Sequence, residues 1–245
     1  MECKKNCSVC LACAHTESEI NPRFTTYHFN ELAVSTGNKK IGQTVNFSLD
    51  NRYCNPEWAC YKYCYAKRYS AFRPSCAKAY SNNTDLLENN PAEFWRGVEK
   101  AFQLAVLENC GLRAHVDGEI PEKQRGGVEY FDKLQKIARK YPQVIVILMT
   151  KRYDVINVWL DQNGGRAALP KNLTPAFSAC DGLEMVNPYG LPVAGFIPKG
   201  EKITDPARVC PNLTAKKNGK KWTCADCIKK GVYCAGGMDR DFLQH

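Results

Sequence analysis

Apolar and polar residues alternate along the stretch QTVNFSLD, residues 43–50. A period of two residues predicts a β-strand with one buried face. Further along, apolar residues recur at every fourth position over residues 94–106, which predicts an amphipathic helix. Asn90 and Pro91 suit the N-cap and the first position of this helix.

The same two patterns keep alternating toward the C-terminus. Further strands are predicted at residues 112–120, 144–149, 173–179 and 192–197, and further helices at 131–141 and 153–160. The run VIVILM at 144–149 is apolar on both faces, as expected for an interior parallel strand. Strands that alternate with helices predict right-handed crossovers around a parallel sheet, open or partly rolled into a barrel.

Cysteine adds candidate chemistry to this α/β pattern, because the 245-residue chain contains 14 of them. Most fall into three groups: Cys3, Cys7, Cys10 and Cys13; Cys54, Cys60 and Cys64; and Cys210, Cys224, Cys227 and Cys234. The remaining three, Cys76, Cys110 and Cys180, are isolated and predict small buried residues.

The surroundings of these cysteines favour metal binding over disulfides. The first residues contain no apolar run typical of a signal peptide, and no stretch approaches the roughly twenty apolar residues of a membrane span. We therefore expect the chain in a reducing cytoplasm. Clustered cysteines there bind metal or do redox chemistry more often than they form disulfides.

The middle cysteines, Cys54, Cys60 and Cys64, follow the first predicted strand. Loops after the strands of parallel α/β folds carry the reactive groups. Zinc and iron-sulfur clusters both bind thiolates, and both take four protein ligands in structural sites. Three thiols leave one metal position open for a substrate or cofactor. The middle group therefore predicts a catalytic site, whereas the two groups of four predict closed sites that are structural or carry electrons.

This loop, RYCNPEWACYKYCYAK, resembles the cysteine loop of radical S-adenosylmethionine enzymes, with Tyr63 before its last cysteine. In that superfamily, three thiolates hold a [4Fe-4S] cluster whose fourth iron binds S-adenosylmethionine. The reduced cluster cleaves this cofactor to a 5'-deoxyadenosyl radical. The spacing here is C-x5-C-x3-C, whereas the superfamily has C-x3-C-x2-C. The latter spacing occurs at Cys3, Cys7 and Cys10, but no strand precedes those residues to aim a cluster into a barrel.

Longer stretches resemble a phage and prophage family named gene product eighty-eight. They lie between residues 35 and 235 and include STGNKKIGQTVNFSLDNRYC, CYAKRYSAF, LRAHVDGEI, YPQVIVILMTKRYD and VCPN. This resemblance implies a fold and a cluster, but no substrate.

The radical-enzyme resemblance also implies residues that bind the cofactor. In that superfamily, a glycine-rich acidic segment after the second strand receives the ammonium group of the cofactor, which implies this role for Gly118 and Glu119. Lys151, after the third predicted strand, is expected to meet the methionyl carboxylate, and Tyr63 is expected at the cofactor as well. No catalytic side chain is identified beyond the metal ligands.

The two terminal groups predict further metal sites. Cys7, Cys10 and Cys13 resemble a ferredoxin-type C-x2-C-x2-C run with Cys3 as fourth ligand, so we expect an auxiliary iron-sulfur cluster, with zinc as the alternative. The closing group, Cys210, Cys224, Cys227 and Cys234, combines a C-x2-C pair with two further thiols. It suits a second auxiliary cluster or a zinc ribbon.

These observations predict three segments: a cysteine-rich one at 1–34, a partial (β/α) barrel with parallel strands at 35–200, and a cysteine-rich one at 201–245. We expect a radical S-adenosylmethionine enzyme that uses an external electron donor and abstracts a hydrogen atom from its substrate. The alternative is a non-catalytic iron-sulfur or zinc protein that binds nucleic acid or a phage protein. The formal net charge of +9 favours nucleic acid, but three thiolate-bound clusters would offset roughly half of it.

Overall fold

The structure is a computed structural model that describes residues 16–17, 26–38, 41–197, 202, 205, 207–212 and 222–243. The predicted N-terminal cluster ligands, Cys3, Cys7, Cys10 and Cys13, lie outside the described residues. Every cysteine inside them is a free thiol. No helix in the described ranges is both long enough and apolar enough to cross a membrane.

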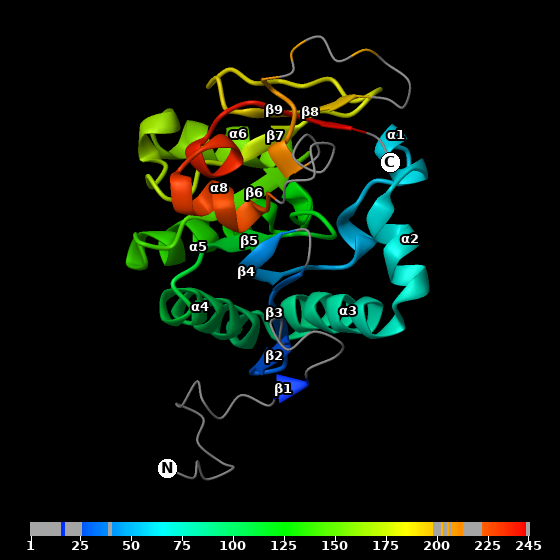
Figure 1. Cartoon of the computed structure of the whole chain (residues 1–245), viewed down its shortest axis with the longest axis vertical. Coiled ribbons are helices and arrows are strands. Elements are labelled where there is room, and N and C mark those ends of the chain that lie inside the picture. Colours follow the sequence, from blue (N-terminus) through cyan, green and yellow to red (C-terminus); the bar gives the residue numbers. More distant parts are fainter. Residues whose placement is uncertain are drawn as a thin grey trace.

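One mixed sheet organises the described part of the chain, and its nine strands follow sequence order (Figure 1). The strands are β1 (Thr16–Glu17), β2 (Thr26–Phe29), β3 (Leu32–Asn38), β4 (Gly42–Phe47), β5 (Leu112–Ala114), β6 (Val146–Thr150), β7 (Ala176–Ser178), β8 (Val193–Ile197) and β9 (Arg240–Leu243). β1 to β4 pair antiparallel, and β4 to β9 pair parallel. The predicted α/β class with a mainly parallel sheet is confirmed. β1 and β9 are the edge strands, so the described strands form no closed barrel.

The helices connect the parallel strands. They are α1 (Ala59–Lys62), α2 (Tyr65–Phe72), α3 (Pro74–Asn89), α4 (Pro91–Leu107), α5 (Gly127–Lys140), α6 (Tyr153–Asn163) and α8 (Cys224–Lys230). Of these, α4, α5 and α6 cover the core face of the sheet. Right-handed crossovers between consecutive parallel strands place the connecting helices on the same side. Accordingly, α4, α5 and α6 lie together on one side of the molecule in Figure 1, while α1 and α2 lie on the other.

The core fills the space between these helices and one face of the sheet. Its largest fully buried side chains are aromatic. Phe47 of β4 meets Phe94 of α4 edge-on, with ring centroids 6.2 Å apart. Phe131 of α5 meets Trp159 of α6 in the same way at 5.2 Å. Burial of each such ring stabilises the fold by about 1.5 to 3 kcal/mol, so these contacts hold the helices against the sheet and against one another.

The C-terminal segment is built onto the same sheet. β9 pairs with β8 at one edge, and α8 packs against β4. The backbone amide of Ala225 donates a hydrogen bond to the carbonyl oxygen of Ile41 at 2.9 Å. α8 therefore lies near the amino end of β4.

Most predicted elements are present, with shifted ends. The Asn90 side chain accepts a hydrogen bond from the Glu93 amide at the start of α4, as predicted for an N-cap. The strand predicted at 112–120 is shorter and ends at Ala114, because His115 and Gly118 adopt positive φ angles that turn the chain. The apolar pattern does not predict α3, whose buried residues include the polar Asn83 and Thr84.

Candidate functional site

The loops that follow β4, β5, β6 and β7 meet at the carboxyl edge of the sheet. They carry a set of side chains that we call the cysteine rim: Cys54, Cys60, Cys64, Asp117, Glu119, Lys151 and Cys180. Cys54, Cys60 and Cys64 are half-buried and interact electrostatically with one another or with Lys151. The structure thus brings the middle cysteines together with Glu119 and Lys151, as the strand order predicts.

The cysteine loop begins in a tight turn after β4. The Asp50 carboxylate accepts a hydrogen bond from the Arg52 amide at 3.0 Å and caps this turn. The Cys54 amide then donates to the Asn51 carbonyl oxygen at 3.0 Å. Cys60 lies on the short helix α1, and Cys64 lies just before α2. Turns rather than long helices therefore set the wide spacing of the three thiols.

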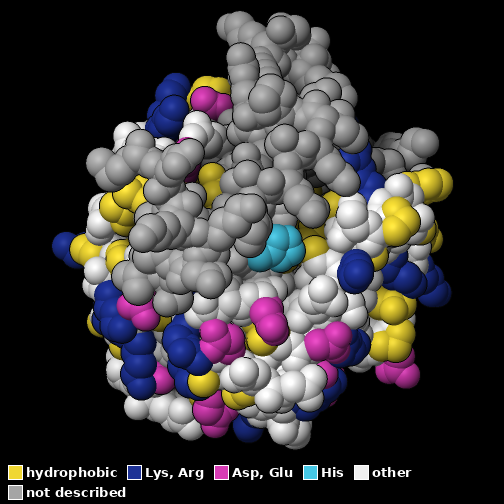
Figure 2. All heavy atoms as spheres, turned by 90° about the horizontal axis from the view of Figure 1, so that it is seen from below, with side chains coloured by type: hydrophobic (Ala, Val, Ile, Leu, Met, Phe, Trp, Pro, Cys, Tyr) yellow, Lys and Arg dark blue, Asp and Glu magenta, His cyan; other side chains and the backbone are white. Residues whose placement is uncertain are grey.

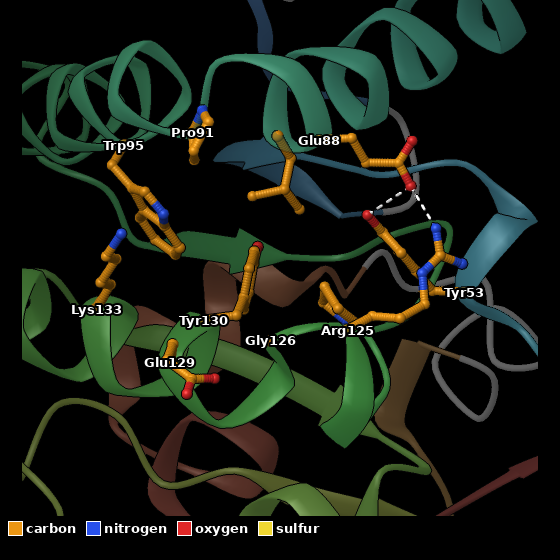
Figure 3. A pocket seen from close by; sticks show the side chains of 11 residues that line it. Tyr53, Glu88, Pro91, Trp95, Arg125, Gly126, Glu129, Tyr130 and Lys133 are labelled. Carbon is orange, nitrogen blue, oxygen red and sulfur yellow. Dashed lines mark hydrogen bonds and ion pairs between the residues drawn. The ribbon is translucent and has the colours of Figure 1, made fainter.

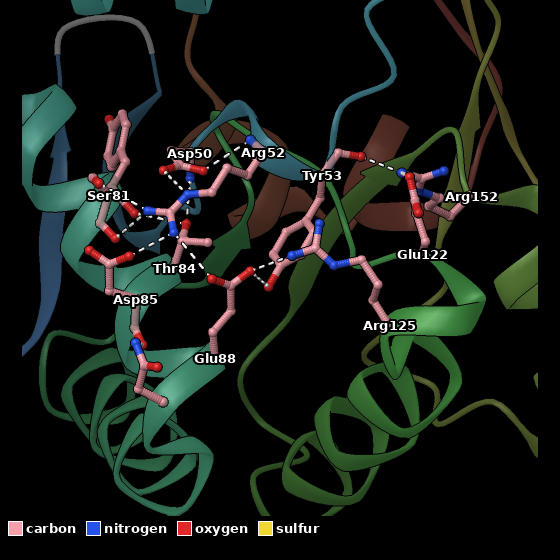
Figure 4. Close-up of polar contacts among 12 residues, drawn as sticks. Asp50, Arg52, Tyr53, Ser81, Thr84, Asp85, Glu88, Glu122, Arg125 and Arg152 are labelled. Atoms are coloured by element: carbon pink, nitrogen blue, oxygen red, sulfur yellow. Dashed lines mark hydrogen bonds and ion pairs between the residues drawn. The ribbon is translucent and has the colours of Figure 1, made fainter.

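Helix α3 anchors this loop from one side, as Figure 4 shows. The Arg52 guanidinium pairs with Asp50 at 2.8 Å, with Asp85 at 2.6 Å and with Glu88 at 3.2 Å. The hydroxyl of Thr84 accepts a hydrogen bond from the Asp50 amide at 2.9 Å. Several charged hydrogen bonds hold the start of the loop in one position, which a metal site needs.

Arg152 anchors the loop from the other side. Its buried guanidinium donates to the backbone carbonyl oxygen of Tyr53, and to that of Ile120 at 3.3 Å. It also pairs with Glu122 at 3.2 Å. The residue that follows Lys151 therefore joins the cysteine loop to the loop after β5.

Glu119 joins the ends of β5 and β6 from within the rim. Its side chain is 3% exposed, and its Oε1 accepts hydrogen bonds from the Ile120 amide at 2.9 Å and the Thr150 hydroxyl at 2.6 Å. Its Oε2 accepts from the Lys151 amide at 2.8 Å. A carboxylate offers roughly four acceptor positions, so these three bonds leave about one for another donor.

Gly118 allows the loop after β5 to lie directly against the cysteine loop. Its φ angle is +78°, and a Cβ atom there would lie 2.4 Å from the carbonyl oxygen of Leu49. Only glycine avoids both the backbone strain and this clash. Tyr63 ends α1 and is 64% exposed, so it is the most open of the predicted cofactor residues.

The surroundings of Cys54 and Cys60 favour the neutral form of these two thiols. Burial raises the pKa of Cys54 to about 12, and the nearby Glu119 and Cys64 raise it further, while Lys151 opposes this. Burial likewise raises the pKa of Cys60 to about 12. Burial lowers the pKa of Lys151, but Glu119 and the rim thiols outweigh this and raise it overall. Such thiols become ligands when a metal displaces their protons.

The sequence pattern predicts Cys180 as an isolated buried cysteine, whereas the structure places it half-buried in the rim beside Cys60. Its sulfur accepts a hydrogen bond from the Cys60 amide at 3.4 Å. A signal was present in the sequence: Cys180 directly follows the strand predicted at 173–179. Cys180 thus follows a parallel strand just as Lys151 does, and the ends of such strands meet at one edge of the sheet.

The C-terminal cysteine group, Cys210, Cys224, Cys227 and Cys234, gathers as predicted. All four side chains line one small cavity of about 30 Å³, together with Arg113 of β5 and two β6 residues, Ile147 and Met149. Ile147 and Met149 alternate along β6 with the core residues Val146 and Leu148. The cavity therefore lies on the sheet face opposite the core.

Two donors point at these sulfurs. Arg113 donates to the Cys224 sulfur at 3.6 Å, and the Trp222 indole donates to the Cys227 sulfur at 3.1 Å. Burial raises the pKa of Cys234 to about 12, and the other three thiols raise it further, while Arg113 opposes this. Donors of this kind stabilise thiolates, as metal sites require.

Neither thiol group forms a finished coordination shell. Within the described ranges, no three cysteine, histidine or acidic side chains stand at the spacing of metal ligands. The structure thus shows two neighbourhoods rich in thiols, one at the carboxyl ends of the strands and one on the sheet face opposite the core.

A larger pocket of about 530 Å³ lies behind the cysteine loop (Figure 3). Trp95, Lys133 and Tyr130 line one side of it, and Tyr53 and Arg125 lie on the other. The Tyr53 hydroxyl and Arg125 both bind the Glu88 carboxylate, at 3.0 Å and 2.6 Å. This side of the pocket belongs to the polar network that anchors the loop.

Charge is mixed on the face of the molecule seen in Figure 2. Basic and acidic side chains lie next to one another across its described surface, with hydrophobic side chains scattered among them. This face therefore offers no argument for the nucleic-acid alternative.

Comparison with known proteins places most of the chain in one family. A family model described as Gene product 88 matches residues 25–230. No curated protein matches the chain, and no solved structure does. The matched range includes the whole cysteine rim and three of the four C-terminal cysteines, Cys210, Cys224 and Cys227. Because the match covers well over half of the length of the chain, the chain belongs to the Gene product 88 family.

Proposed function

We propose that this protein is an iron-sulfur enzyme of the radical S-adenosylmethionine type, with Cys54, Cys60 and Cys64 as ligands of its catalytic cluster. One observation carries the proposal: the three thiols share the carboxyl edge of a parallel sheet with Glu119 and Lys151. In the same proposal, β4 to β9 form a partial barrel. When bound, a three-thiolate cluster supplies the electron that cleaves S-adenosylmethionine, and the resulting organic radical abstracts a hydrogen atom from a substrate.

The donor set of the rim fits such a cluster. Thiolates are the ligands of iron-sulfur clusters, and three of them leave one iron open. The cationic Lys151 lies near Cys54 and Cys60 and offsets part of the negative charge that bound thiolates carry. The polar network around Arg52 and Arg152 holds the loop that presents these sulfurs.

Two side chains of the rim suit the charged ends of the cofactor. The Lys151 ammonium is placed to attract the methionyl carboxylate, because it lies among the rim thiols. The remaining acceptor position of the buried Glu119 carboxylate suits the ammonium group of the cofactor. The protein's contribution is thus to bind, orient and keep water away, while the cofactors supply the chemistry.

The C-terminal cysteine group extends the proposal to a second metal site. Four thiols, with Arg113 and Trp222 as donors, suit an auxiliary iron-sulfur cluster, and zinc is the alternative. The protein would then draw on an external electron donor.

Metal analysis of single variants tests the catalytic assignment. The protein is purified without oxygen, and iron, sulfide and zinc are measured for the wild type and for Cys54→Ala. Loss of about four irons is expected from Cys54→Ala, together with loss of 5'-deoxyadenosine formation under reducing conditions. Cys110→Ala is the matched control, because Cys110 is half-buried and precedes β5, at the opposite end of that strand from the rim. A wild-type protein with zinc but no iron would contradict the proposal.

A further inference from the structure

The position of Cys180 requires an explanation that the three-thiol proposal does not give. It follows β7 and reaches the rim from the strand farthest from the cysteine loop among the four that build it. Its sulfur accepts a hydrogen bond from the Cys60 amide at 3.4 Å, and the thiols of Cys60 and Cys180 interact electrostatically. A sequence-distant cysteine thus touches a predicted metal ligand.

Cys180 also shares the electrostatic surroundings of the middle cysteines. The Lys151 ammonium interacts with Cys180 as well as with Cys60 and Cys54. An amide donor and a nearby ammonium are neighbours that suit a thiolate bound to a metal. Cys54 and Cys60 also lie near the Lys151 ammonium. Cys180 is therefore as suitable a metal ligand as these two cysteines.

The loop around Cys180 lies at the surface. Asp181 and Gly182 follow it directly and are exposed, and a Cβ atom on Gly182 would meet nothing within 4 Å. The Cys180 thiol also donates to the Asp181 carbonyl oxygen at 3.7 Å, a bond within this loop. The exposed residues after Cys180 therefore leave the solvent side of its loop uncovered by the core.

We propose that Cys180 is the fourth thiol of the rim, which binds the iron left open by Cys54, Cys60 and Cys64 until a cofactor with an amine and a carboxylate replaces it. This inference rests on the proposed function. The exchange breaks one iron-sulfur bond and forms bonds from iron to the amine nitrogen and a carboxylate oxygen. The released thiolate takes up the proton that the ammonium group gives up, and no electron moves. Cys180 thereby keeps the fourth iron bound to the protein before the cofactor binds.

The test measures how easily the fourth iron is lost. A cubane cluster with three protein thiolates releases its unprotected iron when it is mildly oxidised with ferricyanide, and electron paramagnetic resonance detects the three-iron product. The full chain is reconstituted without oxygen as wild type, Cys180→Ala, Cys180→Ser and the control Cys110→Ala. Signal that persists in Cys54→Ala comes from other sites and is subtracted.

Without added cofactor, the wild type and Cys110→Ala are expected to keep their rim iron. Cys180→Ala and Cys180→Ser should each lose about one of the four rim irons. Equal loss from the wild type and both Cys180 variants would overturn this inference alone. Equal iron content in the wild type and in Cys54→Ala would overturn the proposed function and this inference together. The serine variant nearly preserves side-chain size, so a folding defect of the alanine variant would not obscure the result.

Discussion

Glu119 binds both neighbouring strand ends through its carboxylate, so its replacement should affect stability before it affects binding. Glu119→Ala removes the acceptor for the Thr150 hydroxyl and for the Lys151 amide, which are hydrogen-bonded at 2.6 Å and 2.8 Å. A buried donor without a partner costs about 1 to 3 kcal/mol, so we expect the free energy of unfolding to fall by at least that amount. Urea denaturation measures this change.

Two further variants separate the structural effect of Glu119 from cofactor binding. Glu184→Ala serves as control, because Glu184 is exposed, and it should leave the unfolding curve in place. Glu119→Gln keeps the size of the side chain but loses its charge. In the reconstituted protein, it should weaken S-adenosylmethionine binding by about 1.5 to 3 kcal/mol, the contribution of a charged hydrogen bond. Unchanged affinity in a titration would remove Glu119 from the cofactor site.

His115 predicts a pH dependence of stability. It is fully buried beside Phe47, and its Nε2 shares a hydrogen bond with the Tyr130 hydroxyl at 2.9 Å. Burial lowers its pKa from 6.5 to about 3. Between these values the unfolded chain binds a proton that the folded chain does not. The contribution of His115 to the free energy of unfolding is therefore fully present above pH 6.5. It falls by about 1.4 kcal/mol per pH unit as the pH drops from 6.5 toward 3.

Comparison of the wild type with His115→Gln isolates this effect. The difference between their free energies of unfolding should shrink as the pH falls from 7 to 4, because the substituted chain has no imidazole to protonate. A difference that stays constant over this range would show that His115 is as easily protonated in the folded protein as in the unfolded chain.

At the scale of elements, the strand-end rule explains what the sequence could predict. It places the cysteine loop after β4 and Lys151 after β6, and the structure brings both to the rim. It cannot show that α3 supports the loop, because α3 does so through polar side chains such as Asn83, which binds the backbone of Ala33 in β3 and of Ser48 just after β4. Polar anchoring of this kind leaves no periodic pattern in the sequence.

Gly118 tests how closely the loops after β4 and β5 must pack. Gly118→Ala adds backbone strain at φ +78°. It also places a Cβ atom 2.4 Å from the Leu49 carbonyl oxygen, which is a clash. Gly164→Ala adds strain at φ +88° but meets nothing within 4 Å. Strain alone costs on the order of 1 kcal/mol, so we expect Gly164→Ala to lower stability by about that amount and Gly118→Ala by clearly more.

The measurement for this pair is thermal unfolding together with iron content. Gly118→Ala should also lower the iron held at the rim, because the clash displaces the start of the cysteine loop, whereas Gly164→Ala should retain it. Similar stability and iron content in the two variants would show that close contact between the loops is not required.

Across the whole molecule, one strand connects the two thiol groups. Arg113 of β5 binds the Cys224 sulfur on one sheet face, and five residues after this strand Glu119 lies in the rim. The clustering of cysteines along the chain predicts both groups. It does not predict that the C-terminal group lies against the sheet, because that follows from contacts between residues far apart in the chain, such as α8 with β4.

The position of Arg113 yields a final prediction about the C-terminal site. Four thiolates around a divalent metal carry a net charge of about −2, and Arg113 and Arg240 are the cationic residues that line the cavity. Arg113→Met keeps much of the side-chain volume but removes the donor to Cys224. Loss of such a supporting residue typically weakens metal binding by about 10 to 100 times, so we expect a decrease of that size in competition with a chelator. Arg96→Met is the control, since Arg96 of α4 is 65% exposed and pairs only locally with Glu93. If Arg113→Met retained its metal as firmly as Arg96→Met does, the guanidinium would have no part in holding the C-terminal thiolates.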